Sequence, residues 1–253
     1  MTTPDRPWFD QSGYGWRFEW GIDGLAALAP HCEVIVVVDV FRFTTCVDVA
    51  LGRGAVLFPY RWYDGSEVAY AAERGAELAV KVAERPGEWT LSPAGLSEVP
   101  SGTRLVLPSP NGSMLCFGAR EAGATRVLAG CVRNAGAVAA VAAASDGAVG
   151  VVAAGERWGG PAGPLRPALE DLIGAGAILA AAGPGADLSP EARSARAAFH
   201  DARPRLAEAL AAGGGGRELT ARGWADDLSL AAALDVSEVV PELVDDRFVD
   251  SSG

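Results

Sequence analysis

Positive charge is scarce in this sequence, and lysine is almost absent. The 253 residues include 21 lysines and arginines against 32 aspartates and glutamates, which gives a formal net charge of −11. Such a chain lacks the basic surface that a sequence-independent nucleic-acid binder needs. A small anionic ligand remains compatible with it, because the local field of a pocket can oppose the net charge. Lys81 is the single lysine and lies outside any GxxxxGK[ST] motif, so a P-loop is excluded.

Histidine and cysteine are also few, which narrows the metal and nucleophile chemistry. His31 and His200 cannot form a three-histidine zinc site, and the sequence has no HExxH motif. The same shortage makes a Ser-His-Asp hydrolase a poor fit. The four cysteines are widely spaced with no CxxC pair, so we expect buried, reduced thiols rather than a zinc ribbon or a disulfide scaffold.

Long apolar runs are missing as well. The aromatic and polar N-terminal segment has no apolar core of the signal-peptide kind, and no run approaches the ~20 residues of a membrane span. We therefore expect a soluble, cytoplasmic protein with neither a membrane nor a nucleic acid as its partner.

What the sequence does contain is a repeated alternation of short apolar runs and helix-compatible stretches. Residues 34–40 (VIVVVDV) are β-branched and apolar on both faces, as in a parallel strand that is covered on both sides. The same pattern predicts strands at 56–60, 104–107, 126–130 and 149–153, and helices at 45–52, 64–80, 113–122, 134–144 and 168–182. The alternation predicts an α/β protein with a largely parallel sheet.

The last third of the chain has a different pattern. Ser189 and Pro190 begin a long Ala- and Arg-rich helix that we expect to reach about residue 211, before a break at GGGG (213–216). Two short helices are predicted within 217–234 and a final strand in VSEVVPELV. No shift in composition separates independent domains. We predict one compact unit over residues 1–253, in one or two lobes, with the aromatic segment 1–30 packed on it.

Polar side chains cluster in the loops that follow the predicted strands. In open parallel sheets these loops gather at one edge and bind ligands there. They carry carboxylates that suit a hard cation, arginines that can grip an anion, and hydroxyls at helix starts that can cradle phosphate. The candidates are Asp39, Arg42, Thr44, Thr45, Ser109, Asn111, Gly112, Ser113, Arg133, Asn134, Glu156 and Arg157.

These candidates also have a purely structural interpretation. Asp39 could be a solvated strand-end carboxylate, but an unpaired charge in an apolar run is costly, which favours a functional role. Residues 109–113 have the composition of a turn, and their place between a strand and a helix also suits a phosphate nest. Glu170 and Asp171 open a predicted helix, where acidic residues favour the helix dipole; the alternative is that they bind Mg²⁺.

Several segments resemble those of one known family, and they occur in the same order. VVVDVFRFTTCV resembles the D-V-L-R-A-T-T segment of the 2-phosphosulfolactate phosphatases (the ComB family). LSPAGL resembles the family's N-S-P segment, and PSPNGS its T-T-N-G-T loop. AGCVRNAGAVA, VVAAGERW with LEDLIGAGAI, and RGWADDLSLAAALDVSEVVPEL are similar to its later segments. The last of these is similar to the pattern G-x-x-x-D-V…V-P. The resemblance covers about residues 34–243.

The resemblance implies a three-layer α/β/α fold and an enzyme that requires Mg²⁺. The implied reaction removes phosphate from 2-phospho-3-sulfolactate and yields 3-sulfolactate, a step of coenzyme M biosynthesis. The substrate would be a small anionic molecule that carries a phosphate group. The matched motif positions are Asp39, Arg42, Thr44, Thr45, Ser92, Asn111, Gly112, Asn134, Glu170, Asp171 and Asp226.

The matches and the loop positions together give three sets of expected site residues. The catalytic set is Asp39, Arg42, Asn111 and Glu170, and the metal set is Asp39, Asp171 and Asp226. The substrate-binding set is Thr44, Thr45, Ser92, Ser109, Gly112, Ser113, Arg133, Asn134, Glu156 and Arg157. Asp39 would act as the nucleophile or as a ligand of Mg²⁺, and the sequence leaves both roles open.

Some positions depart from the family pattern and leave other functions open. Two phenylalanines replace smaller aliphatic residues, Ser-Pro replaces Thr-Thr, a glycine replaces cysteine, and an inserted segment adds Arg157, Trp158 and Arg166. The first four departures are at Phe41, Phe43, Ser109-Pro110 and Gly174. One alternative is a Mg²⁺-dependent phosphatase for another small phosphate monoester, and the other is a non-catalytic anion-binding protein. The set of carboxylates favours catalysis. A homodimer remains open.

Overall fold

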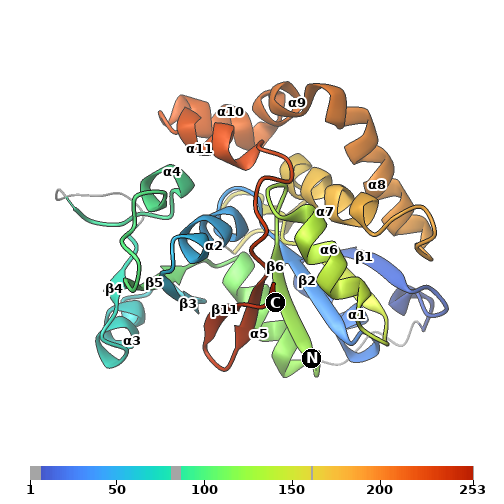
Figure 1. The fold of residues 1–253 in the computed structure, drawn as a ribbon, viewed down its shortest axis with the longest axis horizontal. Coiled ribbons are helices and arrows are strands. Elements are labelled where there is room, and N and C mark those ends of the chain that lie inside the picture. The colour runs from blue at the N-terminus through green and yellow to red at the C-terminus, as the bar shows by residue number, and fades with distance from the viewer. Residues whose placement is uncertain (1–6, 81–86, 161, 253) are drawn as a thin grey trace.

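The computed structural model describes residues 7–80, 87–160 and 162–252. Its centre is a mixed nine-stranded sheet in the order β1-β7-β2-β6-β10-β11-β3-β5-β4 (Figure 1). The strands are β1 (Trp16–Trp20), β2 (Val34–Val38), β3 (Val56–Tyr60), β4 (Glu77–Leu78), β5 (Arg104–Pro108), β6 (Arg126–Gly130), β7 (Val149–Ala153), β10 (Pro241–Val244) and β11 (Arg247–Asp250). The short strands β8 (Glu156–Arg157) and β9 (Leu165–Arg166) form a separate antiparallel hairpin.

The large sheet consists of two parallel parts joined by an antiparallel hairpin. Strands β1, β7, β2 and β6 are parallel neighbours, and so are β3, β5 and β4. The hairpin of β10 and β11 lies between the two parts and pairs antiparallel with β6 and β3. The predicted final strand is thus only the first arm of this hairpin. The second arm was missed because its apolar pair Phe248-Val249 is only two residues long and lies between Arg247 and Asp250.

Helices cover both faces of the sheet. They are α1 (Gly21–Leu28), α2 (Phe43–Gly52), α3 (Ser66–Glu73), α4 (Pro93–Leu96), α5 (Gly112–Glu121), α6 (Ala135–Ala143), α7 (Leu169–Ala181), α8 (Pro190–Ala202), α9 (Leu206–Ala212), α10 (Gly214–Ala221) and α11 (Ala225–Ala231). Alternate residues of β2 face opposite layers, as strand geometry requires. Val34, Val36 and Val38 pack with α6, α7 and α8, whereas Ile35 and Val37 pack with α1, α2 and α5. The predicted α/β/α architecture is confirmed.

Two helices are shorter than the sequence predicted. The helix expected over 64–80 ends at Glu73, and Gly75 then adopts a positive φ of 55° before β4 begins. The helix expected to reach residue 211 ends at Ala202 and is followed by a 3₁₀ turn at Arg203–Arg205. Pro204 explains this break, since a proline inside a helix removes one backbone hydrogen bond and clashes with the preceding turn.

The glycine run 213–216 is also different from the prediction. Only Gly213 separates α9 from α10, and the other three glycines begin α10. A side chain at Gly216 would place its Cβ only 2.0 Å from the carbonyl oxygen of Leu210. The run therefore lets two helices approach closely, and this brings α10 over one end of the sheet (Figure 1).

The N-terminal segment contributes one strand to the sheet and one helix to the layer that covers it. Residues 16–20 form the edge strand β1 and residues 21–28 form α1, whereas residues 1–6 of the expected packed segment lie outside the described residues. The alternation of aromatic and charged residues in WRFEW is a period-2 strand signal that the sequence prediction missed. Within the described part of the chain, no helix has the length and apolar character needed to cross a bilayer.

Candidate functional site

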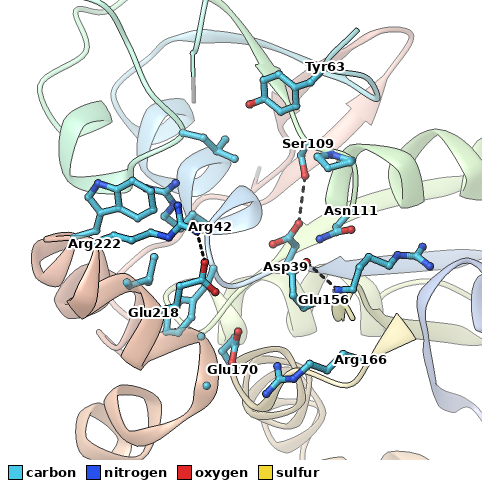
Figure 2. A pocket seen from close by; sticks show the side chains of 18 residues that line it. Asp39, Arg42, Tyr63, Ser109, Asn111, Glu156, Arg166, Glu170, Glu218 and Arg222 are labelled. Atoms are coloured by element: carbon cyan, nitrogen blue, oxygen red, sulfur yellow. Dashed lines mark hydrogen bonds and ion pairs between the residues drawn. The ribbon is translucent and has the colours of Figure 1, made fainter. Parts of the chain in front are cut away.

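A cleft of about 570 Å³ lies beyond the ends of three strands. Asp39 follows β2 and Glu156 lies just beyond β7, its parallel neighbour, so these two loops meet at one carboxyl edge as expected. Ser109 follows β5 in the other parallel part of the sheet, and its loop reaches Asp39. Helix α10 and the residues before α11 form the opposite wall. The cleft is lined by Asp39, Phe41, Arg42, Tyr63, Leu91, Ser109, Pro110, Asn111, Glu156, Arg157, Arg166, Glu170, Gly214, Gly215, Glu218, Leu219, Arg222 and Trp224 (Figure 2).

Asp39 lies at the centre of this cleft, between the Ser109–Asn111 loop and Glu170 (Figure 2). Its carboxylate accepts a hydrogen bond of 2.8 Å from the backbone N–H of Gly112 and one of 3.4 Å from the Ser109 hydroxyl. Burial raises the pKa of Asp39 to about 7, and the nearby negative charge of Glu156 adds to the effect. A carboxyl group with such a raised pKa in a cleft is typical of a functional site.

Four residues of the expected substrate-binding set shape the loops but do not line the cleft. The hydroxyls of Thr44 and Thr45 donate to the backbone oxygens of Asp39 and Val40, and Ser113 donates to Leu107. The side chain of Asn134 bonds to three backbone groups, which are Cys131 N–H, Ala129 C=O and Val239 C=O. These polar side chains are fully buried and satisfy backbone groups, as buried polar groups generally must. The expectation that they touch substrate is corrected accordingly.

Arg42 reaches the cleft from the start of α2. Its Nη1 donates a hydrogen bond of 2.9 Å to Asp227, and its guanidinium lies 3.9 Å from the ring centroid of Trp224. Ser92, expected to bind substrate, instead donates a 2.5 Å hydrogen bond to Asp227. It also caps α4 by accepting from the backbone N–H of Gly95. Ser92 therefore acts on the cleft only through Asp227.

The expected metal ligand Asp226 is placed outside the cleft. Its side chain is exposed, whereas the neighbouring Asp227 is buried and faces Arg42. The sequence held a signal for this difference, because in the pattern G-x-x-x-D the acid after Gly223 falls at position 227. Asp227 is thus the residue that the motif should have indicated, and its partner in the structure is an arginine.

Glu170 and Asp171 begin α7 and face different surroundings. Asp171 accepts hydrogen bonds of 2.8 Å from the backbone N–H groups of Val40 and Gly155, so its carboxylate ties two loops together. Glu170 lines the cleft, and burial raises the pKa of both carboxyls. Gly215 packs so closely on Glu170 that a Cβ there would lie 2.1 Å from its Oε1.

The carboxylates do not form the three-residue metal site that was expected from Asp39, Asp171 and Asp226. Among the described residues, no group of three or more His, Cys, Asp or Glu side chains is arranged to hold a metal ion. The donor set nevertheless suits a hard cation, because Asp39 and Glu156 both carry carboxylate oxygens. Burial raises the pKa of Asp39, and the negative charge of Glu156 raises it further. Mg²⁺ in enzymes is commonly held by one or two carboxylates, with water and substrate phosphate completing its shell.

The expected arginines divide between two places. Arg157, together with Glu156, projects from the β8–β9 hairpin and lines the cleft, as does Arg166 from the same hairpin. Arg133 lies elsewhere: its Nε donates a 2.7 Å hydrogen bond to the fully buried carboxylate of Asp48. The loop after β6 therefore contributes no side chain to the cleft, contrary to the expectation for Arg133 and Asn134.

Several cleft residues were not anticipated, and four of them carry polar or aromatic side chains. Tyr63 follows β3, and Glu218, Arg222 and Trp224 belong to the helical cap formed by α10 and the start of α11. Burial raises the pKa of Tyr63 to about 12, so it is a neutral hydrogen-bonding group at neutral pH. Tyr63 lies in the loop after a predicted strand, so the strand-end rule could have indicated it. No spacing rule links the three cap residues to the strand-end loops, because the cap reaches the cleft through the packing of α10 on α7 and Glu170.

The departures from the family pattern are not all near the cleft. Phe41, Ser109 and Pro110 line it. Phe43 is fully buried and packs on Phe248, and Gly174 allows α7 to approach Val40, whose Cγ2 would lie 2.6 Å from an added Cβ. The departures that can alter which substrate fits are therefore the first group and the inserted Arg157 and Arg166, which also line the cleft.

The comparison with known proteins agrees with this arrangement. No curated protein matches the chain. A family model described as 2-phosphosulpholactate phosphatase matches residues 26–246, nearly the whole sequence. The match includes the strand-end loops, the β8–β9 hairpin and the helical cap that form the cleft. The chain therefore belongs to the 2-phosphosulpholactate phosphatase family, a family of phosphoric monoester hydrolases.

Proposed function

We propose that this protein hydrolyses 2-phospho-3-sulfolactate to 3-sulfolactate and inorganic phosphate, and that the reaction requires Mg²⁺. The observation that carries the proposal is the position of Asp39. Its buried carboxylate, with a raised pKa, faces a cleft that also contains Arg42, Arg157, Arg166 and Arg222. The family match supports the same reaction class.

The charge distribution of the cleft suits a substrate with several anionic groups. A molecule with phosphate, sulfonate and carboxylate groups needs local cations to bind an acidic protein of net charge −11. Arginine is well suited to all three groups, because its planar guanidinium donates two parallel hydrogen bonds to such oxygens. Two of the arginines come from the β8–β9 hairpin and two lie beside Trp224, so the cations flank the cleft from two sides.

The carboxylates of the cleft could bind Mg²⁺. Asp39 and Glu156 would hold it, with waters and phosphate oxygens as further ligands. The ion would neutralise negative charge on the phosphate and make the phosphorus atom more open to attack.

The side chains of the cleft can divide the steps of phosphate transfer between them. In one case Asp39 attacks phosphorus with a carboxylate oxygen, the P–O ester bond breaks, and water then hydrolyses the aspartyl phosphate to release phosphate. In the other case water attacks phosphorus directly and breaks the same P–O ester bond, and Asp39 would serve as a metal ligand. The leaving alkoxide takes up one proton, and water is consumed overall. Glu170 is suited to supply that proton, because burial raises its pKa and so favours its protonated form. The arginines stabilise charge on the phosphate oxygens.

A second substrate class is favoured by one observation. Phe41 and Pro110 replace other residue types and line the cleft, so its wall is more apolar on that side. Another small phosphate monoester would then be the substrate of the same chemistry. A non-catalytic anion binder is disfavoured, because it would have no use for the buried carboxylates of Asp39 and Glu170.

The test is phosphate release from purified protein. We expect Mg²⁺-dependent turnover of 2-phospho-3-sulfolactate, loss of turnover in EDTA, and recovery when Mg²⁺ is restored. The matched substrate is 2-phospholactate, which lacks only the sulfonate and should have a higher KM. Faster turnover of 2-phospholactate, or of another monoester in the same series, would favour the second substrate class. Undiminished turnover in EDTA would refute the metal requirement.

A further inference from the structure

Asp227 is a buried carboxylate that bonds to two segments far from it in the sequence, the start of α2 and the start of α4. It is 2% exposed and lies on α11. One oxygen accepts from Arg42 Nη1 at 2.9 Å, and the other accepts from the Ser92 hydroxyl at 2.5 Å and from the backbone N–H of Ala94 at 3.1 Å. Three donors, one of them charged, bind both oxygens of this carboxylate, so its orientation is fixed.

Trp224 completes the surroundings of Arg42. It lies three residues before Asp227 at the start of α11, so the two side chains lie on the same face of that turn. The Arg42 guanidinium is 3.9 Å from the ring centroid of Trp224, and that of Arg222 is 5.5 Å from it. One face of α11 thus holds the Arg42 guanidinium by a charged hydrogen bond and by stacking.

This arrangement has a cost that calls for an explanation. The Arg42 side chain is 13% exposed and that of Asp227 is 2% exposed, and burying such a pair rarely adds stability over apolar residues. The pair can instead favour binding. An arginine side chain that moves freely loses rotamer entropy when it binds an anion, whereas a guanidinium that Asp227 already holds in place loses less.

We propose that Asp227 is a positioning residue for substrate binding. It acts through Arg42, whose guanidinium it holds at the wall of the cleft, and through Ser92 it links the same carboxylate to α4. The proposal rests on the proposed function for the identity of the substrate, and it adds a role to the helical cap: α11 carries the element that orients a substrate-binding arginine of α2.

The decisive experiment is a comparison of Asp227→Asn with Asp226→Asn, its exposed neighbour on the same helix. In Asp227→Asn we expect the KM for 2-phospho-3-sulfolactate to rise about tenfold or more with a smaller change in kcat, because a charged hydrogen bond that orients Arg42 is lost. Asp226→Asn should leave both constants unchanged. Equal KM values for the two variants and the wild type would overturn the proposal.

A double variant tests whether the effect passes through Arg42. If Asp227 acts only by orienting Arg42, then adding Asp227→Asn to Arg42→Ala should raise KM no further than Arg42→Ala alone. Independent effects would multiply, and that result would refute the positioning role. Thermal unfolding of each variant shows whether it is folded. If Asp227→Asn does not fold, Ser92→Ala serves instead, with an expected rise in KM of about threefold; an unchanged KM in folded Ser92→Ala would then refute the proposal.

Binding of inorganic phosphate, measured by calorimetry, separates this inference from the proposed function. Phosphate probes the anion site without any turnover. If the wild type fails to hydrolyse 2-phospho-3-sulfolactate but Asp227→Asn weakens phosphate binding about tenfold and Asp226→Asn does not, the substrate assignment fails and the positioning role stands. Unchanged phosphate affinity in Asp227→Asn, alongside an unchanged KM, would reject the positioning role.

Discussion

The backbone N–H of Gly112 donates a 2.8 Å hydrogen bond to the carboxylate of Asp39, which joins the start of α5 to the end of β2. This approach is possible only because residue 112 has no side chain. A Cβ there would lie 2.2 Å from Cδ1 of Phe43 and 2.7 Å from Oδ2 of Asp39. Gly112 therefore contributes to the site through its backbone, which gives the Asn-Gly step of the loop a structural reason.

Gly112→Ala should impair both stability and turnover. The added methyl group must displace the Phe43 ring or the Asp39 carboxylate, and overpacking of this kind costs about 1–3 kcal/mol. Urea unfolding and phosphate release would measure the two effects. The matched control is Gly185→Ala, where a Cβ meets no atom within 4 Å. If the two variants behave alike, the close approach at Gly112 is not required.

Asp39→Asn should lose activity while gaining stability. The amide retains the shape and can still accept from Gly112, but it carries no charge, so turnover should fall ~10²–10³-fold or more. Unfolding at pH 8 should need more denaturant than for the wild type, because a buried charged carboxylate is removed. Trapping with beryllium fluoride then separates the two roles of Asp39, since a nucleophile forms a stable phosphate-mimic adduct and a metal ligand does not. Near-normal turnover of the variant would exclude both roles.

The stability of the protein should fall as pH rises from about 4 to about 7, in the part that Asp39 contributes. The folded state holds the Asp39 proton up to its pKa of about 7, whereas the unfolded chain releases it near 3.8. The folded state therefore binds more protons across this window, which makes the slope negative, at about 1.4 kcal/mol per pH unit. Asp171, whose pKa is also raised, acts in the same direction.

The measurement is urea unfolding at pH 5 and pH 8 without divalent cations, for the wild type and for Asp39→Asn. Carboxylates with lowered pKa, such as Glu242, contribute the opposite slope, so the difference between the two proteins isolates Asp39. We expect this difference to favour the variant more at pH 8 than at pH 5. A difference that is independent of pH would contradict the raised pKa.

Arg133→Ala should reduce the stability of the protein, whereas Arg157→Ala should raise the KM. Arg133 pairs with the fully buried Asp48 outside the cleft, and removal of one partner of a buried pair costs about 3–5 kcal/mol. We expect a lower unfolding free energy with an unchanged KM for Arg133→Ala. Arg157 lines the cleft, so Arg157→Ala should raise KM and leave stability nearly unchanged. Denaturant unfolding and steady-state kinetics distinguish the two variants. A raised KM in an Arg133→Ala variant of unchanged stability would show that Arg133 binds substrate.

The sequence by itself determined the layered architecture and the edge of the sheet that carries the cleft. Residues 34–38 are apolar on both faces, so they had to form a strand covered on both sides, and a parallel strand order sends the following loops to one edge. That reasoning grouped Asp39, Ser109, Asn111 and Glu156. In the structure Asp39 and Glu156 follow parallel neighbours, and the loop after β5 brings Ser109 and Asn111 to the same cleft.

Only the tertiary structure decided which arginines and carboxylates meet. Arg42 and Asp227 are 185 positions apart, and whether residue 226 or 227 of the chain faces inward depends on how α11 is rotated against its neighbours. The loop after β6 was equally plausible from its sequence, but Asp48 draws the Arg133 guanidinium away from the cleft. Local periodicity sets which element forms and which face is apolar, whereas the pairing of single charges depends on packing between distant elements, which no local pattern encodes.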